Sequence, residues 1–422
     1  MTEKKEINDS AEIIPEYVDK ASAKDVNVAT AGRSKKQLIA IIIASIVAVI
    51  GIGLWVFQLA GGMVNTNMRN LDCWGVYIIM FMLFVGLSAG GLIISSVPKV
   101  FNIQGFGPIS KVAVWVSICC TILAVAFVIV DMGGPLRLWE LIVFANLSSP
   151  LMWDVIVLTL YLVISLVYLR AILRSEQGKG TKTGLRVLST VALICAIAVH
   201  TVTAWIFGLQ AAHDFWYTAI LGPWFVTSAL LSGLGLVLVI VLALRKTGYV
   251  KLEMPEISKM ARLLGVFMVI DLYFFACDLL TSGYSGGAGS DVVALLTSGP
   301  LAPFFWTEII FGVVVMLIAF VPKLRSVSLV TVAAVLAMGA TLLKRIQLLL
   351  SGFQLPNIDY ASVVTGPALG GASLPSAPVA GAIVYSPSPL ELGIVLGVLA
   401  LGVALILAGL RFLPLQPTNT NH

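Results

Sequence analysis

His200 is the residue whose type and setting most strongly suggest chemistry. It lies in the segment 198–233, AVHTVTAWIFGLQAAHDFWYTAILGPWFVTSALLSG, between two long apolar runs. An ionisable side chain inside a bilayer is costly and usually marks a path for ions, protons or substrate. The alternative is that His200 only hydrogen-bonds to a carbonyl of a neighbouring helix. The residue by itself leaves both interpretations open.

Several carboxylates also fall within or beside apolar segments. Asp271 and Asp278 are seven residues apart, so they lie on one helical face at different depths, the spacing of a two-step proton relay. Asp131 precedes a Gly-Gly-Pro turn and is either a partner of Arg137 or an acceptor for a ligand hydroxyl. Structural ion pairs are the alternative for some of these charges. Asp154, Glu308 and Glu391 also fall within or at the edge of apolar segments.

Two adjacent basic residues, Lys344 and Arg345, interrupt another apolar run and are followed by Gln347. They either neutralise the carboxylates or bind a carbonyl oxygen of a quinone and stabilise the charge that develops on it. For Arg345 we favour neutralisation. For Lys344 both roles stay open.

The composition defines the kind of chain that must position these groups. It has 422 residues, of which 59% are hydrophobic and 11% charged, with a mean hydropathy of +1.01. These values predict an integral membrane protein, and apolar runs of about 20 residues predict an all-α fold. The five cysteines and three histidines show no spacing typical of a cluster or haem, so we expect neither in this chain. No metal site or nucleophile triad is expected.

Ten membrane spans are predicted between a cytoplasmic N-terminal tail, residues 1–36, and a cytoplasmic C-terminal tail, residues 412–422. The spans form one membrane domain over residues 37–411. Their predicted ranges are 37–59, 74–97, 110–132, 150–172, 185–209, 223–246, 258–281, 303–322, 326–350 and 389–411.

Charge predicts the orientation in the cytoplasmic (inner) membrane. With the N-terminus inside, all basic residues except Arg69, Arg137, Lys344 and Arg345 fall on the cytoplasmic side. The net charge of +5 is therefore a topology signal, and it does not indicate nucleic-acid binding. His200 and most of the buried acids then lie in the outer half of the membrane.

An internal repeat is also predicted. Pro150 and Trp153 open one span as Pro303 and Trp306 open another, and the small-residue clusters 86–91 and 228–235 recur in step. Two four-helix bundles, spans 2–5 and 6–9, would then be flanked by two peripheral spans. The small clusters either let helices pack closely or line a flat ligand slot, and we favour packing for 86–91.

Five motifs together resemble one family. The runs are WGVYIIMFMLFVGLSAGGLIISS, DMGGPLRLWELIVFANLSSPLMWD, HTVTAWIFGLQ followed by PWFVTSALLSG, KRIQLLLSGFQLP, and YSPSPLELGIVLG. They resemble the NrfD/PsrC superfamily of quinone-interacting membrane subunits of respiratory oxidoreductases. The run HTVTAWIFGLQ is most similar to the DsrP branch, whose members belong to the sulfite-reduction-associated DsrMKJOP complexes.

The resemblance implies a subunit without redox metals that binds menaquinone near the outer face. It implies an outer-face, ferredoxin-like iron-sulfur partner, and the DsrP likeness adds cytochrome b, cytochrome c and further iron-sulfur subunits. The polypeptide itself is then either quinone-reactive or non-catalytic. The implied quinone-binding residues are His200, Asp131, Tyr77 and Lys344. The implied proton-path residues are Asp271, Asp278, Glu308, Glu391, Asp154 and Arg345.

Two other function classes compete with this interpretation. Ten spans with a repeat and buried acids also suit a secondary transporter, although its site is expected near the membrane midplane at broken helices. A passive membrane anchor of a complex would leave His200 and the buried acids without a role. We expect an iron-sulfur partner to dock on the long outer loops 133–149, 282–302 and 351–388, which are nearly free of basic residues.

Overall fold

The structure, a computed structural model, describes residues 35–68, 72–101, 107–213, 215–250, 252–284, 286–354 and 385–413. Over these residues it is helical and contains no strand. The two predicted tails fall outside the described residues, apart from two residues of each. Most of the predicted loop 351–388 does so as well.

Ten helices are long and apolar enough to cross a membrane, as predicted. Their ends differ from the predicted ones by at most four residues, and the all-α, ten-span fold is confirmed. They are α2 (Lys35–Gly61), α3 (Val76–Val100), α4 (Gly107–Asp131), α6 (Pro150–Glu176), α7 (Lys182–Gly208), α8 (Leu221–Lys246), α9 (Met254–Tyr284), α11 (Ala302–Phe320), α12 (Val327–Gln354) and α14 (Pro389–Phe412).

Shorter helices occupy several connections. Two of them were not predicted: α5 (Glu140–Val143) between α4 and α6, and α10 (Ala288–Thr297) between α9 and α11. Three single 3₁₀ turns, η1 (Met63–Asn65), η2 (Pro135–Arg137) and η3 (Pro322–Leu324), complete the described elements. We call the end of the molecule where α4 ends and α6 begins the outer end, after the predicted topology.

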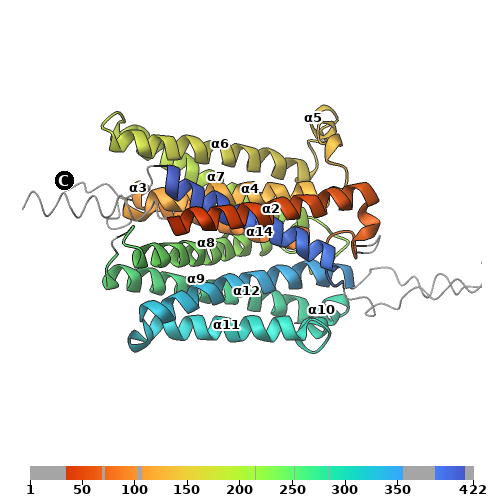
Figure 1. Ribbon diagram of the computed structural model, residues 1–422. Coiled ribbons are helices and arrows are strands. Elements are labelled where there is room, and N and C mark those ends of the chain that lie inside the picture. The colour runs from red at the N-terminus through yellow and green to blue at the C-terminus, as the bar shows by residue number, and fades with distance from the viewer. Residues whose placement is uncertain are drawn as a thin grey trace, which may run out of the picture.

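Helix pairing divides the long helices by position in the sequence. α3 packs against α4 and α7, and α6 packs against the same two helices. α8 packs against α9 and α12, and α11 packs against the same two. α2 and α14 cross each other over α4 (Figure 1). Since α8 also packs against α3 and α7, the two groups share a broad contact, and their division into two bundles remains a prediction.

The contact between α3 and α8 depends on small residues from both predicted clusters. A Cβ atom added to Gly90 would meet the backbone of Ala229 and Gly233, and one added to Gly233 would meet Gly90. Backbones approach this closely only where side chains are absent. These two glycines therefore serve helix packing, and residues 77–96 of α3 are buried among its neighbouring helices.

Hydroxyl groups join α3, α4 and α6 at two levels. Tyr161 donates to the carbonyl of Ser88 at 2.9 Å, and its hydroxyl lies 2.6 Å from Ser117 Oγ. Seven residues further along α6, Tyr168 donates to the carbonyl of Ser95 at 3.2 Å. Since seven residues are two helical turns, the same face of each helix is used twice. These bonds hold the three helices in register.

We expect Tyr161→Phe to lower the stability of the protein by about 1 kcal/mol, because interhelical hydrogen bonds in membrane proteins contribute on this scale. Thermal unfolding of the purified protein in detergent measures the change. Tyr284→Phe is the control, since Tyr284 is 96% exposed. Equal unfolding temperatures for the two variants would show that the hydroxyl of Tyr161 contributes nothing.

Candidate functional site

A cavity of about 770 Å³ lies at the outer end among α3, α4, α6, α7 and the segment 132–149. Most of its wall is apolar, and its charged lining residues are Asp131, Asp154 and the pair of Arg137 and Glu140. A cavity of this size and polarity suits a flat organic ligand whose few polar atoms need specific partners. Its apolar wall includes Trp74, Val128, Phe144, Leu151, Val155 and Phe207.

Asp131 reaches the cavity because α4 ends there. Gly133 follows with a φ of 65°, a left-handed conformation that favours glycine and turns the backbone away from the helix axis. The Oδ1 atom of Asp131 is buried and has no hydrogen-bond partner among the described residues. A buried acceptor without a partner is costly, so this atom is suited to a ligand hydroxyl.

Arg137 does not neutralise Asp131, which was one of the two expected roles. Its guanidinium donates to both carboxylate oxygens of Glu140, at 2.8 and 3.0 Å. The other expectation for Asp131, an acceptor for a ligand hydroxyl, is compatible with its place in the cavity wall.

Asp154 is the second acid of the cavity and comes from the first turns of α6. Thr203 on α7 donates to its Oδ1 at 2.6 Å, which orients the carboxylate. Asp154 was predicted as part of a proton path. Its position makes it a direct neighbour of any molecule in the cavity.

Aromatic rings form the wall of the cavity on the α3 and α7 side. Trp74 and Phe207 both line it, with ring centroids 5.8 Å apart in an edge-to-face contact. Behind them, Trp216 stacks on Trp74 at 6.4 Å and donates its indole N–H to the carbonyl of Leu348 at 2.6 Å. Sequence reasoning did not select Trp74, although its place at the outer start of a span was a usable signal.

Tyr77, predicted to bind quinone, is fully buried but is not among the residues that line the cavity. Its hydroxyl donates to Gln58 Oε1 at 2.6 Å. Gln58 in turn donates to the carbonyl of Val130, next to Asp131. Tyr77 therefore ties α2 to α3 and α4 behind the cavity.

Glu391, predicted for a proton path, forms a capping box with Ser388 at the start of α14. It also accepts a bond from the Tyr385 hydroxyl at 2.5 Å and one from the Asn67 backbone N–H at 3.1 Å. Burial and the neighbouring carboxylate raise the pKa of Tyr385, so this phenol stays protonated and keeps donating. These contacts give Glu391 a structural role.

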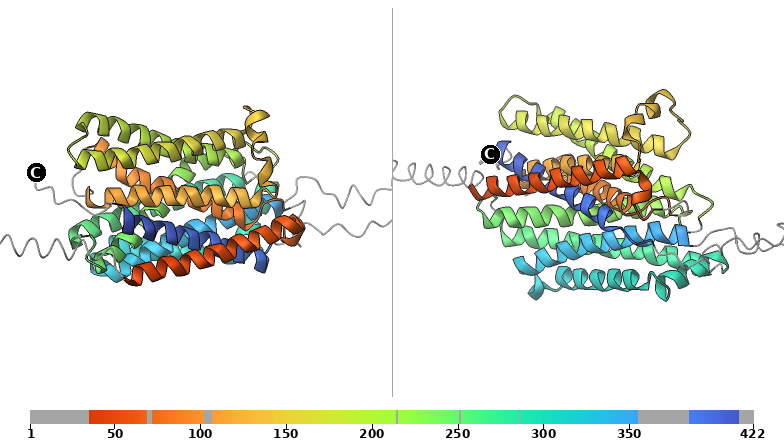
Figure 2. Two further views of the ribbon diagram at one scale, coloured as in Figure 1. Left: turned by 45° about the horizontal axis from the view of Figure 1, so that its top comes forward. Right: turned by 45° about the vertical axis from the view of Figure 1, so that its right-hand side comes forward.

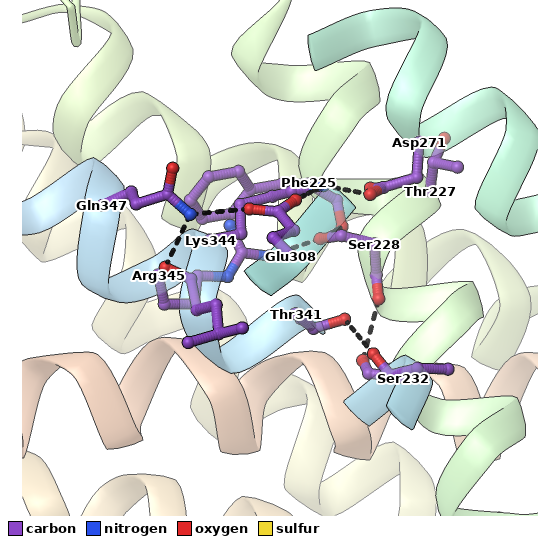
Figure 3. A network of polar contacts seen from close by, with 12 residues as sticks. Phe225, Thr227, Ser228, Ser232, Asp271, Glu308, Thr341, Lys344, Arg345 and Gln347 are labelled. Atoms are coloured by element: carbon purple, nitrogen blue, oxygen red, sulfur yellow. Dashed lines mark hydrogen bonds and ion pairs between the residues drawn. The ribbon is translucent and has the colours of Figure 1, made fainter. Parts of the chain in front are cut away.

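A second polar centre lies in the core among α8, α9, α11 and α12 (Figure 3). Lys344 forms ion pairs with Asp271 and, at 3.3 Å, with Glu308, and all three side chains are at most 3% exposed. Gln347 donates to the other Glu308 oxygen at 2.7 Å. Of the two roles left open for Lys344, these contacts favour neutralisation of acids.

Arg345 lies beside this network, without an ion pair within the part of the sequence that the structure describes. Its guanidinium donates to Ser228 Oγ at 2.5 Å and stacks 3.6 Å from the ring centroid of Phe225. The expected role of Arg345 was acid neutralisation. In the structure its neighbour Lys344 makes those ion pairs.

His200 is 2% exposed and lies within electrostatic reach of Arg345, beside Gly86. It is not among the cavity-lining residues, so the structure does not bring it together with Asp131. Over the described residues, no group of three or more His, Cys, Asp or Glu side chains is placed to hold a metal ion.

The predicted two-step relay along α9 is not joined by a direct contact. Asp278 is buried against Thr218, and its Oδ2 has no hydrogen-bond partner among the described residues. Asp271 instead pairs with Lys344 on α12. A proton moving between the two carboxylates would therefore need an intermediate carrier.

Comparison with known proteins gives one family match. Residues 64–357 match the family model described as polysulphide reductase, NrfD. The sequence is 33% identical to a putative dimethyl sulfoxide reductase membrane subunit of Halobacterium salinarum, over 89% of this chain and 90% of that protein. It is 26% identical to an Hdr-like menaquinol oxidoreductase integral membrane subunit of Archaeoglobus fulgidus, over 88% and 92% of the two proteins. It is also 26% identical to a subunit of the polysulfide reductase of Wolinella succinogenes, over 56% of this chain and 79% of that protein.

Proposed function

Since the chain belongs to the polysulphide reductase NrfD family, we propose that it is the quinone-interacting membrane subunit of a respiratory oxidoreductase complex. Menaquinone is the proposed substrate, and the name of the Archaeoglobus fulgidus relative, a menaquinol oxidoreductase subunit, supports this choice. The protein exchanges electrons between the quinone and an iron-sulfur subunit bound at the outer face.

The cavity at the outer end is the observation that carries this proposal. Its apolar wall suits the ring and tail of a quinone, and the indole of Trp74 offers a flat surface to the ring. Asp131 and Asp154 offer acceptors to the two hydroxyl groups of the reduced form. Asp131 lines the cavity, whereas the other three predicted quinone-binding residues, His200, Tyr77 and Lys344, do not.

The reaction needs proton acceptors beside the ring. Oxidation of a quinol releases two electrons and two protons, and reduction of the quinone consumes the same number. Asp131, whose Oδ1 has no partner among the described residues, accepts one hydroxyl proton and passes it to water at the outer face. Asp154, held by Thr203, accepts the other.

The network of Lys344, Asp271 and Glu308 is proposed as part of a proton route in the second group of helices. Buried, paired ionisable groups inside a membrane protein are often proton relays, which supports this assignment. His200 and Arg345 extend the network towards α3 and α7. A link of the whole complex to sulfite reduction, with DsrMKJOP-like partners, is a further part of the proposal and depends on the motif resemblance alone.

Blocking the cavity tests the proposal. Val128→Phe introduces a larger side chain into the wall, and we expect at least a tenfold loss of quinol-dependent electron transfer in the purified complex, because the ring no longer fits. Quinone extracted from the purified complex is expected to fall in parallel.

Val125→Phe is the matched control, since Val125 lies on the same helix and is not part of the cavity wall. Both variants must assemble with their partner subunits for the comparison to hold. Full turnover and full quinone content in an assembled Val128→Phe complex would place the quinone site elsewhere.

A further inference from the structure

The segment 135–147 carries an unusual set of exposed apolar side chains. Leu136 is 92% exposed, Ile142 79% and Phe144 74%. Trp139, Val143 and Leu147 are each more than half exposed as well. The charged pair of the segment, Arg137 and Glu140, is satisfied internally by two hydrogen bonds. A surface of this kind on a soluble loop would be an aggregation hazard or an interaction site.

The position of the segment indicates what covers this surface. α5 lies beside the outer end of α6, at the edge of the helix layers, and does not extend beyond the ends of α2 and α12 (Figure 1). The turned views in Figure 2 show the same sideways placement. Trp153 donates its indole N–H to the carbonyl of Leu147 at 2.6 Å, which fixes the segment to the start of α6.

The apolar surface of the segment continues along α6. Leu151 and Leu160 are about half exposed on this helix, and Val155 is 39% exposed between them. In a helix that crosses a membrane, such residues contact lipid. The surface of α5 is therefore continuous with a surface that must be covered by acyl chains.

The cavity described above opens on this same surface. Phe144, Leu151 and Val155 line the cavity and are also exposed on the outside of the molecule. These three residues form an apolar side of the opening, between α5 and α6. The exposed residues Arg137 and Asn146 also line the cavity and form a polar side. An opening with both sides suits the boundary between acyl chains and headgroups.

We propose that the segment 135–147 lies in the outer leaflet, at the boundary between headgroups and acyl chains, and that the opening between α5 and α6 admits an isoprenoid-tailed quinone from the bilayer. Short apolar segments with one charged face adopt this interfacial position, with Trp at headgroup level. The ion pair of Arg137 and Glu140 then lies at the headgroup side. The proposed lipid contact of this segment replaces our sequence-based expectation that residues 133–149 contact a partner protein. The second half of the proposal depends on the proposed function, whereas the first half does not.

Accessibility of a spin label tests the lipid contact. A nitroxide is attached to Ile142→Cys in a cysteine-free background, in liposomes, with and without the partner subunits that copurify with the protein. We expect higher accessibility to oxygen, which concentrates in lipid, than to a water-soluble nickel complex in both states. Gln210→Cys, on an exposed outer loop, is the control and is expected to show the reverse. A water-accessible label at 142 overturns the proposal, and so does a label that becomes shielded from both reagents on assembly, which would indicate a partner protein.

Tail dependence tests the opening. Ile142 does not line the cavity, and Ile142→Asp is expected to draw α5 out of the lipid. We expect the KM for long-tailed menaquinol to rise about tenfold, equivalent to about 1.4 kcal/mol, with little change for tail-less menadiol. Leu209→Asp, on another exposed outer loop, is the control. If Ile142→Asp raises the KM for both quinols equally while Val128→Phe blocks turnover of both, the proposed opening is wrong and the proposed function stands. If Val128→Phe blocks neither, the proposed function itself fails.

Discussion

Replacing Lys344 with methionine is expected to destabilise the protein by about 3–5 kcal/mol, because it leaves two buried carboxylates without their cation. Lys344 is 3% exposed, and Asp271 and Glu308 are equally buried, so water cannot replace the lost ion pairs. Methionine preserves the length and most of the packing against Trp224 and Phe275. Unfolding in detergent, followed by temperature or by denaturant, measures the loss.

A combined variant separates charge from packing. Asp271→Asn and Glu308→Gln, added to Lys344→Met, remove the two unpaired charges while keeping the size of each side chain. We expect the combined variant to recover most of the lost stability, since a neutral replacement of a whole buried charge set is often tolerated. If Lys344→Met alone is as stable as the wild type, the network does not contribute in the way its geometry indicates.

Replacing Asp131 with asparagine is expected to slow quinol oxidation by roughly 10²-fold or more, the usual effect of removing a general base. Asparagine has the same shape and still accepts a hydrogen bond, so the quinol binds. It cannot take the proton, however. The expected signature is therefore a large fall in kcat with a small change in KM, measured on the assembled complex with saturating menaquinol.

Asp291→Asn is the control for this experiment, because Asp291 is an exposed carboxylate on α10, away from the cavity wall. It is expected to leave both kinetic constants unchanged. Unchanged turnover in Asp131→Asn would assign the proton transfer to Asp154 or to water, and Asp131 would then serve only to shape the cavity.

The fold was predictable from the sequence because local composition decides it. A run of about 20 apolar residues must be a helix in a membrane, since its backbone groups have no other partners there. Basic residues predicted an orientation by the same kind of local reasoning, although the structure does not test it. The helices α5 and α10 were missed because they are too short to leave a periodic signal, at four and ten residues.

The candidate site was only partly predictable, as Asp131 and Tyr77 illustrate. Asp131 was selected from its place at the end of a span and from the family resemblance, and Tyr77 from the resemblance alone. Asp131 faces the cavity, whereas Tyr77 donates to Gln58 on α2 and lines no cavity. The rotation of a helix about its axis decides between these outcomes, and that rotation depends on the neighbouring helices.

The sequence by itself determined that this protein is a bundle of ten apolar helices with a small set of costly polar groups inside it. Those properties follow from the hydrophobic effect and from backbone hydrogen bonding, which act on each segment separately. Only the tertiary structure decided which polar groups meet: Lys344 with Asp271 and Glu308, and Asp131 with Asp154 across one cavity. The residues of each set are 23 to 73 positions apart in the sequence. They lie on different helices, and the rotation of those helices is set by packing such as that of Gly90 against Gly233.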